Sequence, residues 1–205
     1  MHPIFKQRLA DMPVSARLLL TAVLFTLGTG YLFALTNMTL KVGFTKEDVA
    51  LHYYGNEASR EALRELEQEE VPAESGGEVV EGEEFSFDDL EQDADISSEP
   101  IVPVPTLEAL VAEGHFHLFG YTSIFFLCGL VVLFADLRLW LKNTLIVAPF
   151  AASVLDIWSM LLTRFVGAGF SWMLMISGFV MALSFLCVFS VGIYQMWFQK
   201  QPVAA

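Results

Sequence analysis

Basic residues are scarce in this sequence, where 11 Lys and Arg stand against 24 Asp and Glu among 205 residues. A nucleic-acid surface needs clustered cations, so this balance excludes nucleic acid as a partner. The chain also lacks a glycine-rich phosphate loop, a zinc-ligand spacing and a Ser/His/Asp arrangement. Because these common signs of enzymatic chemistry are missing, we predict a non-catalytic protein.

Cysteine is equally rare. Cys128 and Cys187 are the only two, and both fall within apolar runs, where cysteine behaves as a small core residue. The acidic region at residues 37–114 has none, so it can form no internal disulfide. A c-type haem is attached through a CxxCH sequence, and its absence excludes that cofactor.

Apolar residues, by contrast, are abundant, at 55% of the chain, and the mean hydropathy is +0.54. Runs of about 20 apolar residues are long enough to cross the hydrocarbon layer of a membrane. Four such runs predict spans at residues 18–36, 115–136, 145–163 and 170–198. The first run is too long for a secretory signal and no clear cleavage site follows it, so we interpret it as an uncleaved anchor. The predicted fold is an all-α integral membrane protein, a four-helix transmembrane bundle.

The few basic residues predict the orientation of this bundle, because Lys and Arg concentrate in cytoplasmic segments. They occur before the first span, between the second and third, and after the fourth: Lys6, Arg8, Arg17, Arg138, Lys142 and Lys200. Residues 1–17, 137–144 and 199–205 are therefore expected in the cytoplasm. The loop at 37–114 and the turn at 164–169 are expected outside it, although Arg164 departs from the pattern.

The loop at 37–114 holds most of the acidic charge, with 21 Asp and Glu and four Lys and Arg. The capping-box pair Thr45 and Asp48, with Gly55 beyond it, predicts a helix at about 46–54, and a second is expected at 57–70. Residues 71–105 are rich in acids, Pro and Gly and contain no base, a composition typical of disorder. The alternative is an acidic arm that binds a basic soluble protein such as a cytochrome c.

Small residues line one face of the first span at a spacing of four: Ala22, Thr26, Gly30 and Ala34. Such a ladder lets another helix backbone approach closely in a membrane. Gly178 and Ala182 in the fourth span give a weaker version of the same pattern. We expect these positions to pack against a helix, either within the bundle or in another membrane subunit, while the remaining surface contacts lipid.

Ionisable residues gather where the second span begins. Successive helical residues turn by about 100°, so His115 and His117 lie roughly 200° apart and cannot share one metal ion on a helix. His117 does share a face with Tyr121, four residues on. Asp156, deep in the third span, is costly to bury and is expected to face a partner or a water-filled cavity.

These residues support two interpretations. A relay from His117 through Tyr121 to Asp156 forms if the second and third spans pack with those faces together. Alternatively, His117 bonds at the membrane interface, and Asp156 is protonated or bonded to a serine or an indole. His115 is expected at the interface in either case.

A b-type haem is poorly supplied with ligands, because it normally takes axial ligands from two helices. The first, third and fourth spans contain no histidine. His117 would need a methionine partner (Met160, Met173 or Met175), a second subunit's His117, or His52 or His2 reaching in from outside the spans. His115 and His117 are likewise the candidate metal ligands, with no metal specified.

Five strings carry a family resemblance: GTGYLFALTN, HYYGN, HFHLFGYTSIFF, DIWSMLLTR and YQMWF. In these the chain resembles a family of uncharacterised proteobacterial inner-membrane proteins associated with respiratory and cytochrome gene neighbourhoods. The resemblance implies a bacterial inner-membrane location with residues 37–114 in the periplasm, and a bias toward electron-transfer chains. It also implies that His115, His117 and Asp156 are motif positions. Some members carry a c-type haem motif in the outward loop, which this chain lacks.

Two functional hypotheses follow. The first is a non-catalytic accessory or assembly subunit of a larger membrane complex, respiratory by the resemblance. The second is a redox protein that binds haem, a metal or a quinone through His117, Tyr121 and Asp156. A proton or ion pathway through Asp156 is a third, narrower alternative.

Overall fold

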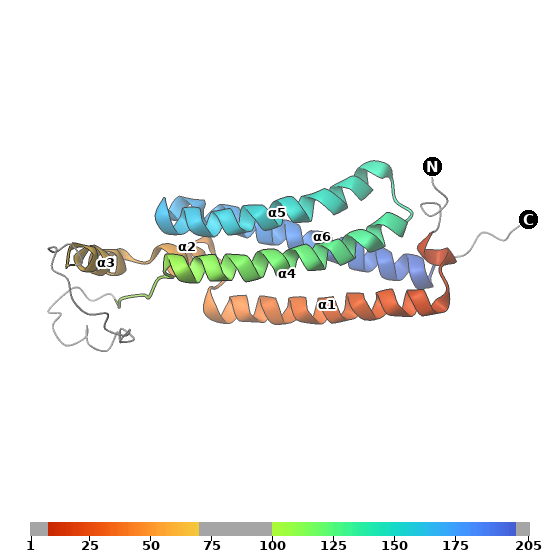
Figure 1. The fold of residues 1–205 in the computed structure, drawn as a ribbon, viewed down its shortest axis with the longest axis horizontal. Coiled ribbons are helices and arrows are strands. Elements are labelled where there is room, and N and C mark those ends of the chain that lie inside the picture. Colours follow the sequence, from red (N-terminus) through yellow and green to blue (C-terminus); the bar gives the residue numbers. More distant parts are fainter. Residues whose placement is uncertain (1–7, 70–99, 200–205) are drawn as a thin grey trace, which may run out of the picture. The chain divides into compact units, whose positions relative to one another are not determined.

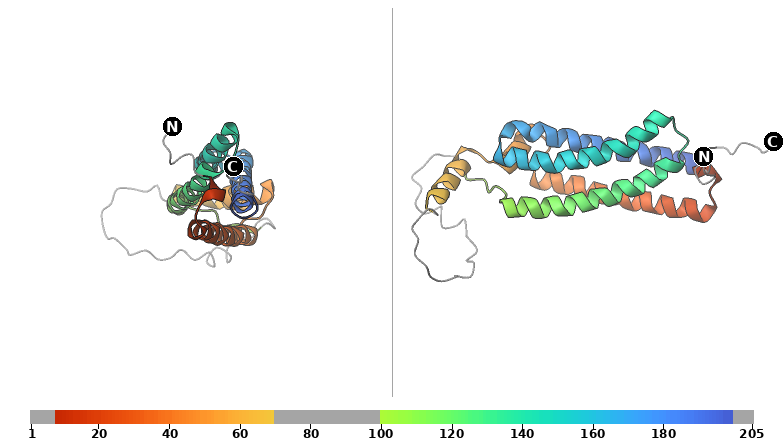
Figure 2. Two further views of the ribbon diagram at one scale, coloured as in Figure 1. Left: turned by 90° about the vertical axis from the view of Figure 1, so that its right-hand side faces the viewer. Right: turned by 45° about the horizontal axis from the view of Figure 1, so that its top comes forward.

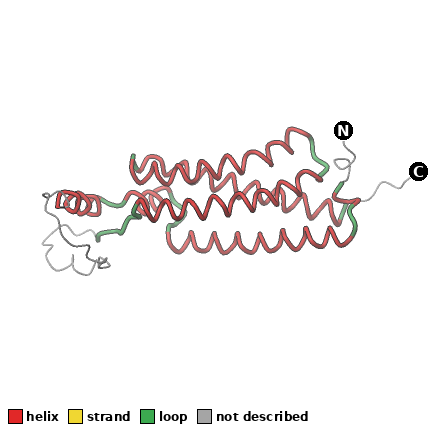
Figure 3. Tube along the Cα trace, in the orientation of Figure 1, coloured by secondary structure: helices red, strands yellow, loops and turns green. Residues whose placement is uncertain are grey.

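The computed structural model describes residues 8–69 and 100–199, and within these ranges all regular structure is helical (Figures 1 and 3). The chain divides into two compact units, residues 1–54 with 105–205 and residues 55–104. The first unit contains four helices long and apolar enough to cross a membrane. The protein is therefore an all-α membrane protein with four candidate spans, as its apolar runs predicted.

The four long helices run alongside one another in the first unit (Figures 1 and 2). They are α1 (Val14–Lys41), α4 (Leu107–Phe134), α5 (Leu139–Phe165) and α6 (Ser171–Trp197). At 1.5 Å per residue each is about 40 Å long, which exceeds a hydrocarbon core of roughly 30 Å. The helices therefore continue beyond the apolar runs that revealed them.

Helix ends differ from the predicted spans because a helix continues until its end groups are capped, not until its residues become polar. Helix α4 begins eight residues before 115, where the Thr106 Oγ1 accepts a hydrogen bond from the Ala109 N–H at 3.2 Å. Helix α5 begins at Leu139, inside the predicted loop at 137–144. The α4–α5 connection is thereby reduced to residues 135–138.

Helices α4, α5 and α6 form the packed part of the unit. The short helices α2 (Lys46–Tyr54) and η4 (Ala168–Phe170) contact one end of the α5–α6 pair. One core cluster joins all four long helices, and a second joins α2 to α4, α5 and α6 through Val49, Tyr53, Leu110, Met160 and Leu174. The second cluster is what places α2 over this end of the bundle.

Helix α2 is fixed by the predicted capping box. The Asp48 N–H donates to Thr45 Oγ1 at 3.0 Å, and the Thr45 N–H donates to Asp48 Oδ2 at 3.1 Å. Hydrogen bonds from the side chain and backbone of Thr45 to the carboxylate hold the pKa of Asp48 below its ordinary value. Gly43, with φ of 96°, turns the chain between α1 and α2 in a conformation that favours glycine.

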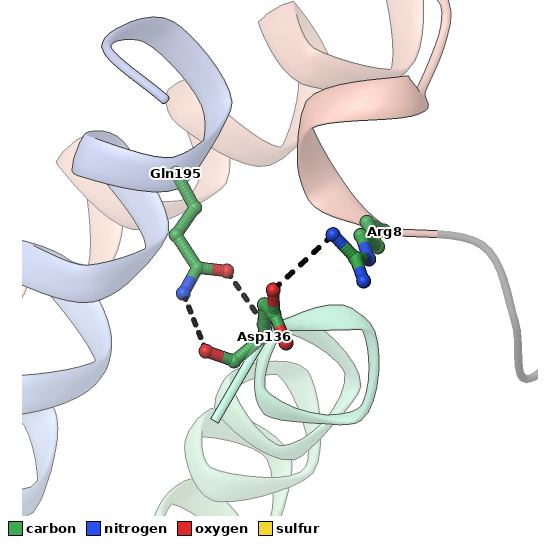
Figure 4. Close-up of polar contacts among 3 residues, drawn as sticks. All are labelled: Arg8, Asp136 and Gln195. Carbon is green, nitrogen blue, oxygen red and sulfur yellow. Dashed lines mark hydrogen bonds and ion pairs between the residues drawn. The ribbon is translucent and has the colours of Figure 1, made fainter. Parts of the chain in front are cut away.

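The other end of the bundle is tied by polar contacts around Asp136 (Figure 4). The Asp136 N–H donates to Gln195 Oε1 at 2.7 Å, and Gln195 Nε2 donates to the Asp136 carbonyl at 3.1 Å. Arg8 lies 3.4 Å from the Asp136 carboxylate. Nearby, Arg17 Nη1 donates to the Met196 carbonyl at 2.9 Å. Three chain segments thus meet here: residues 8–17, which lead into α1, the α4–α5 turn and the end of α6.

The second unit contains α3 (Glu57–Glu69), which follows Gly55 at φ of 79°. Residues 100–104 are held against the start of this helix. Asn56 Nδ2 donates to the Pro100 carbonyl at 2.7 Å, and the Val102 N–H donates to Ser59 Oγ at 2.8 Å. These bonds give residues 100–104 defined partners, although they belong to the segment expected to be disordered. The rest of that segment, up to residue 99, lies outside the described residues.

Candidate functional site

Asp156 is the buried carboxyl of the bundle. It projects from the middle of α5, its residue is 6% exposed, and it is reached by hydroxyls from two other helices. Tyr121 on α4 donates its Oη hydrogen to Asp156 Oδ2 at 3.2 Å. Ser177 on α6 has its Oγ 2.7 Å from Asp156 Oδ1. Among the described residues, no Lys or Arg forms an ion pair with this carboxyl.

The helix pair that positions Asp156 packs through small hydroxyl residues. Leu174, Met181, Val188 and Gln195 repeat every seven residues and are buried on α6. The buried serines of α6 lie beside them on the same face: Ser171, Ser177 and Ser184. Facing them on α5 is a stripe of buried hydroxyl residues: Ser153, Ser159 and Thr163. Small side chains let membrane helices approach closely, and this seam brings Ser177 to Asp156.

A second group of ionisable side chains continues from Tyr121 along α4. The His117 and Tyr121 ring centroids are 5.4 Å apart. His117 Nε2 lies 3.9 Å from Glu113 Oε1, and these two side chains are 41% and 39% exposed. The His117 Nδ1 atom is buried and has no hydrogen-bond partner in the described chain. Glu113, His117 and Tyr121 therefore form a row from a partly exposed surface to the buried carboxyl.

Two tyrosines from other helices also face this region. Tyr53 on α2 is 5% exposed and interacts electrostatically with Glu113 and Asp156. Burial raises the pKa of Tyr53, and these two carboxyls raise it further. Tyr31 on α1 stacks on Phe185 with ring centroids 5.5 Å apart and also interacts electrostatically with Asp156.

His52 lies beside Tyr53 on α2 and is half-buried. Burial lowers its pKa below the ordinary 6.5, and the nearby Lys41 lowers it further. Glu113 acts in the opposite direction. His52 therefore stays neutral in the folded protein at pH values where an exposed histidine is already protonated.

The structure brings together some of the predicted site residues and separates others. Tyr121 and Asp156 are hydrogen-bonded, and His117 is beside Tyr121, so α4 and α5 do pack with those faces together. His115 is exposed and contacts the ring of Phe119 instead, with centroids 4.9 Å apart. Met160 is buried, whereas Met173 and Met175 are half-buried. Within the described ranges, no group of three His, Cys, Asp or Glu side chains is arranged to hold a metal ion.

The small-residue ladder of α1 lies on the exposed side of that helix. Ala22, Thr26, Gly30 and Ala34 are all exposed, and a side chain added at Gly30 or Gly178 would meet nothing within 4 Å. Helix α1 instead contacts α6 through Leu24, Gly28 and Tyr31, which lie on its other face. The ladder therefore does not provide the contact between α1 and the bundle.

Sequence patterns pointed less clearly to three other residues of the site. Ser177, Tyr53 and Tyr31 all face Asp156. Tyr31 and Tyr53 lie in the strings GTGYLFALTN and HYYGN, but those strings did not indicate that either side chain faces Asp156. The seven-residue repeat that ends at Gln195 was the available signal for Ser177, since it marks the packed face of α6. The arrangement as a whole can hold a proton on Asp156, or bind a small polar ligand through its carboxyl and hydroxyl groups.

Comparison with known proteins yields one match. A family model described as a transmembrane helical domain matches residues 43–203, which include every described helix after α1. No curated protein and no solved structure matches the chain. Because the match covers more than half of the sequence and the four long apolar helices agree with it, the chain belongs to this family of transmembrane helical domains.

Proposed function

We propose that the protein is a non-catalytic accessory or assembly subunit of a larger bacterial inner-membrane complex, of the respiratory or electron-transfer kind. The observation that carries this proposal is the state of α1. Only 6% of the most apolar stretch of α1 is buried against the rest of the chain, compared with 39% of the corresponding stretch of α5. The family match also begins after α1, at residue 43. Helix α1 is thus an apolar helix added to the edge of a domain that packs mainly without it.

The exposed face of α1 suits another helix better than lipid alone. Ala22, Thr26, Gly30 and Ala34 form a flat stripe along that face, with open space above Gly30. In a membrane, association depends on close packing of small residues, since lipid tails are as apolar as leucine. We therefore place a membrane helix of a partner subunit on this stripe.

A paired substitution tests the placement. Gly30→Leu fills the stripe, whereas Gly120→Leu fills equally open space on α4. Native electrophoresis of mild-detergent extracts should show the wild type and Gly120→Leu in one larger complex and Gly30→Leu released from it. Migration of the wild type alone from its native membranes contradicts the proposal, as does equal release by both substitutions.

The proposed topology places both termini in the cytoplasm and residues 37–114 in the periplasm. It is supported by the meeting of Arg8, Arg17 and Lys142 at one end of the first unit, where Lys142 Nζ donates to the Leu133 carbonyl at 3.0 Å. Basic residues favour the cytoplasmic side. A fluorescent protein fused after residue 205 should fluoresce, because it folds in the cytoplasm, whereas alkaline phosphatase fused there should be inactive. The opposite pair of results contradicts this topology.

For the acidic loop we propose a basic soluble partner such as a cytochrome c. Its 21 acidic residues against four basic ones support such a partner by charge complementarity. Binding of a basic cytochrome c to the purified protein should weaken steeply as salt rises from low to physiological concentration. Binding that is absent at low salt, or insensitive to salt, contradicts this partner.

A second candidate function is a membrane redox protein, favoured by the row of Glu113, His117 and Tyr121 leading to Asp156. The unpartnered Nδ1 of His117 could bond to a quinone carbonyl or ligate a b-type haem. A reduced-minus-oxidised spectrum, together with quinone and metal analysis of the purified protein, tests this function. Substituting His117 by Ala should abolish any signal, and His115→Ala, two residues away and exposed, should retain it. A signal equal in both variants excludes His117 as the ligand.

A further inference from the structure

The hydrogen atoms around Asp156 can be counted from the geometry. Ser177 Oγ lies 2.7 Å from Asp156 Oδ1 and also 2.7 Å from the Leu174 carbonyl oxygen. A serine hydroxyl has one hydrogen to donate. A carbonyl oxygen has none, so Ser177 satisfies Leu174 only by donating to it. When the serine hydrogen points to the Leu174 carbonyl, the hydrogen in the other short contact comes from the carboxyl.

A protonated Asp156 satisfies every contact. Its Oδ1–H donates to Ser177 Oγ, the Ser177 hydroxyl donates to the Leu174 carbonyl, and the Tyr121 hydroxyl donates to Asp156 Oδ2. With an ionised carboxylate, both contacts at Ser177 would have to share the single serine hydrogen. A neutral acid also avoids the cost of burying an unpaired charge within the membrane.

The groups that face Asp156 come from every helix packed around it. They are Tyr31 on α1, Tyr53 on α2, Glu113, His117 and Tyr121 on α4, and Ser177 on α6. The row on α4 continues to partly exposed side chains at His117 and Glu113. Tyr121 is the titratable group that is hydrogen-bonded to the acid in the described chain, so the row on α4 is the connection to the surface that begins with a direct contact.

We propose that Asp156 is a proton-binding site that exchanges its proton with the aqueous phase beside Glu113, by way of Tyr121 and His117. The ligand is the proton itself. The site requires no partner subunit and no cofactor, so its test is independent of the tests of the functions proposed above. It gives the protein a means of sensing or passing protons within the membrane.

Carbodiimide labelling tests the protonation state on the unaltered protein. The reagent N,N′-dicyclohexylcarbodiimide takes the proton of a buried carboxylic acid on nitrogen while the acid oxygen bonds to its central carbon. The adduct rearranges to a stable N-acylurea that mass spectrometry of peptides locates. Near neutral pH, Asp156 should be labelled and Asp136, half-exposed beside Arg8, should not. An unlabelled Asp156, together with an infrared carboxylic-acid band that is unchanged in Asp156→Asn, overturns the proposal.

The exchange route is tested by transferring the protein to heavy water and following the shift of the Asp156 carboxylic-acid band. Tyr121→Phe and His117→Ala should each slow this shift several-fold, whereas the exposed neighbour control, His115→Ala, should leave its rate unchanged. Equal rates in all four proteins overturn the route through α4. Circular dichroism and elution from a sizing column verify that each variant is folded before it is compared.

Discussion

Asp136 and Asp156 are both aspartates in the membrane-spanning unit, yet their surroundings differ in kind. Asp136 occupies the α4–α5 turn, where its side chain is half-exposed and lies beside Arg8 (Figure 4). Asp156 lies within the bundle, where hydroxyls are the only hydrogen-bond partners of its carboxyl in the described chain. One carboxyl lies beside an arginine near the end of the bundle, and the other is held where a charge is expensive.

The comparison shows which polar contacts hold the fold together and which are available for function. Gln195 bonds to the Asp136 backbone and not to its carboxylate, so the fold there depends little on the charge. At Asp156 the side chain itself carries the contacts. Stability should therefore depend on the backbone bonds of Asp136 at one region and on the side-chain bonds of Asp156 at the other, and substitutions should distinguish the two.

The largest effect is expected from Ser177→Leu. Ser177 is fully buried between α5 and α6, so the larger side chain forces the helices apart and removes a partner of Asp156. The free energy of unfolding should fall by about 1–3 kcal/mol. Titration with a denaturing detergent, followed by circular dichroism, measures it. Ser190→Leu, exposed on the same helix, should have little effect, and an equal loss in both variants contradicts this account.

Gln195→Ala should follow, with a loss of about 1–2 kcal/mol, because it leaves the Asp136 N–H and carbonyl without their partner. Gln195 is 7% exposed, which limits replacement by water. The same detergent titration applies. If Gln195→Ala lowers the free energy of unfolding no more than a substitution on the exposed surface does, the Asp136 turn is not held through its backbone.

Tyr121→Phe removes one hydrogen bond to Asp156 without changing the ring. Hydrogen bonds between membrane helices contribute about 0.6 kcal/mol on average, so the expected loss is of that order. Tyr194→Phe, on the exposed face of α6, is the matched control and should be neutral. If the two variants unfold alike, the bond at 3.2 Å adds nothing measurable to stability.

A smaller effect is expected from Asp136→Asn, which breaks the contact with Arg8 but keeps both backbone bonds to Gln195. Exposed ion pairs contribute about 0.2–1 kcal/mol and are screened by salt. The difference from wild type should therefore shrink at high ionic strength. A large loss that salt does not alter would mean that the Asp136 charge matters as much as its backbone, and the contrast with Asp156 would fail.

Much of the fold and part of the site could be predicted because they depend on distances along one helix. The lengths of the apolar runs predicted the four spans. The rise per residue of a helix predicted that Tyr121 and Asp156 lie at similar depths in the membrane. Which helix faces lie together depends on rotation and pairing between helices, which spacing within one helix does not contain. A spacing of four identified a face of α1 but not what it faces, and Ser177 was reached only through its contact with another helix.

The smallest effect concerns pH and the α2 end of the bundle. Because burial lowers the pKa of His52, the unfolded chain takes up a proton more readily than the folded one once the pH falls below about 6.5. Stability from this residue is complete above that value and is lost on acidification. The drop in the unfolding midpoint between pH 7.5 and 5.5 should therefore be smaller in His52→Gln than in the wild type. Asp48 does not interfere, since its ordinary pKa of 3.8 is lowered further and lies below this range. An identical drop in both proteins would show that His52 does not contribute to the acid sensitivity of the fold.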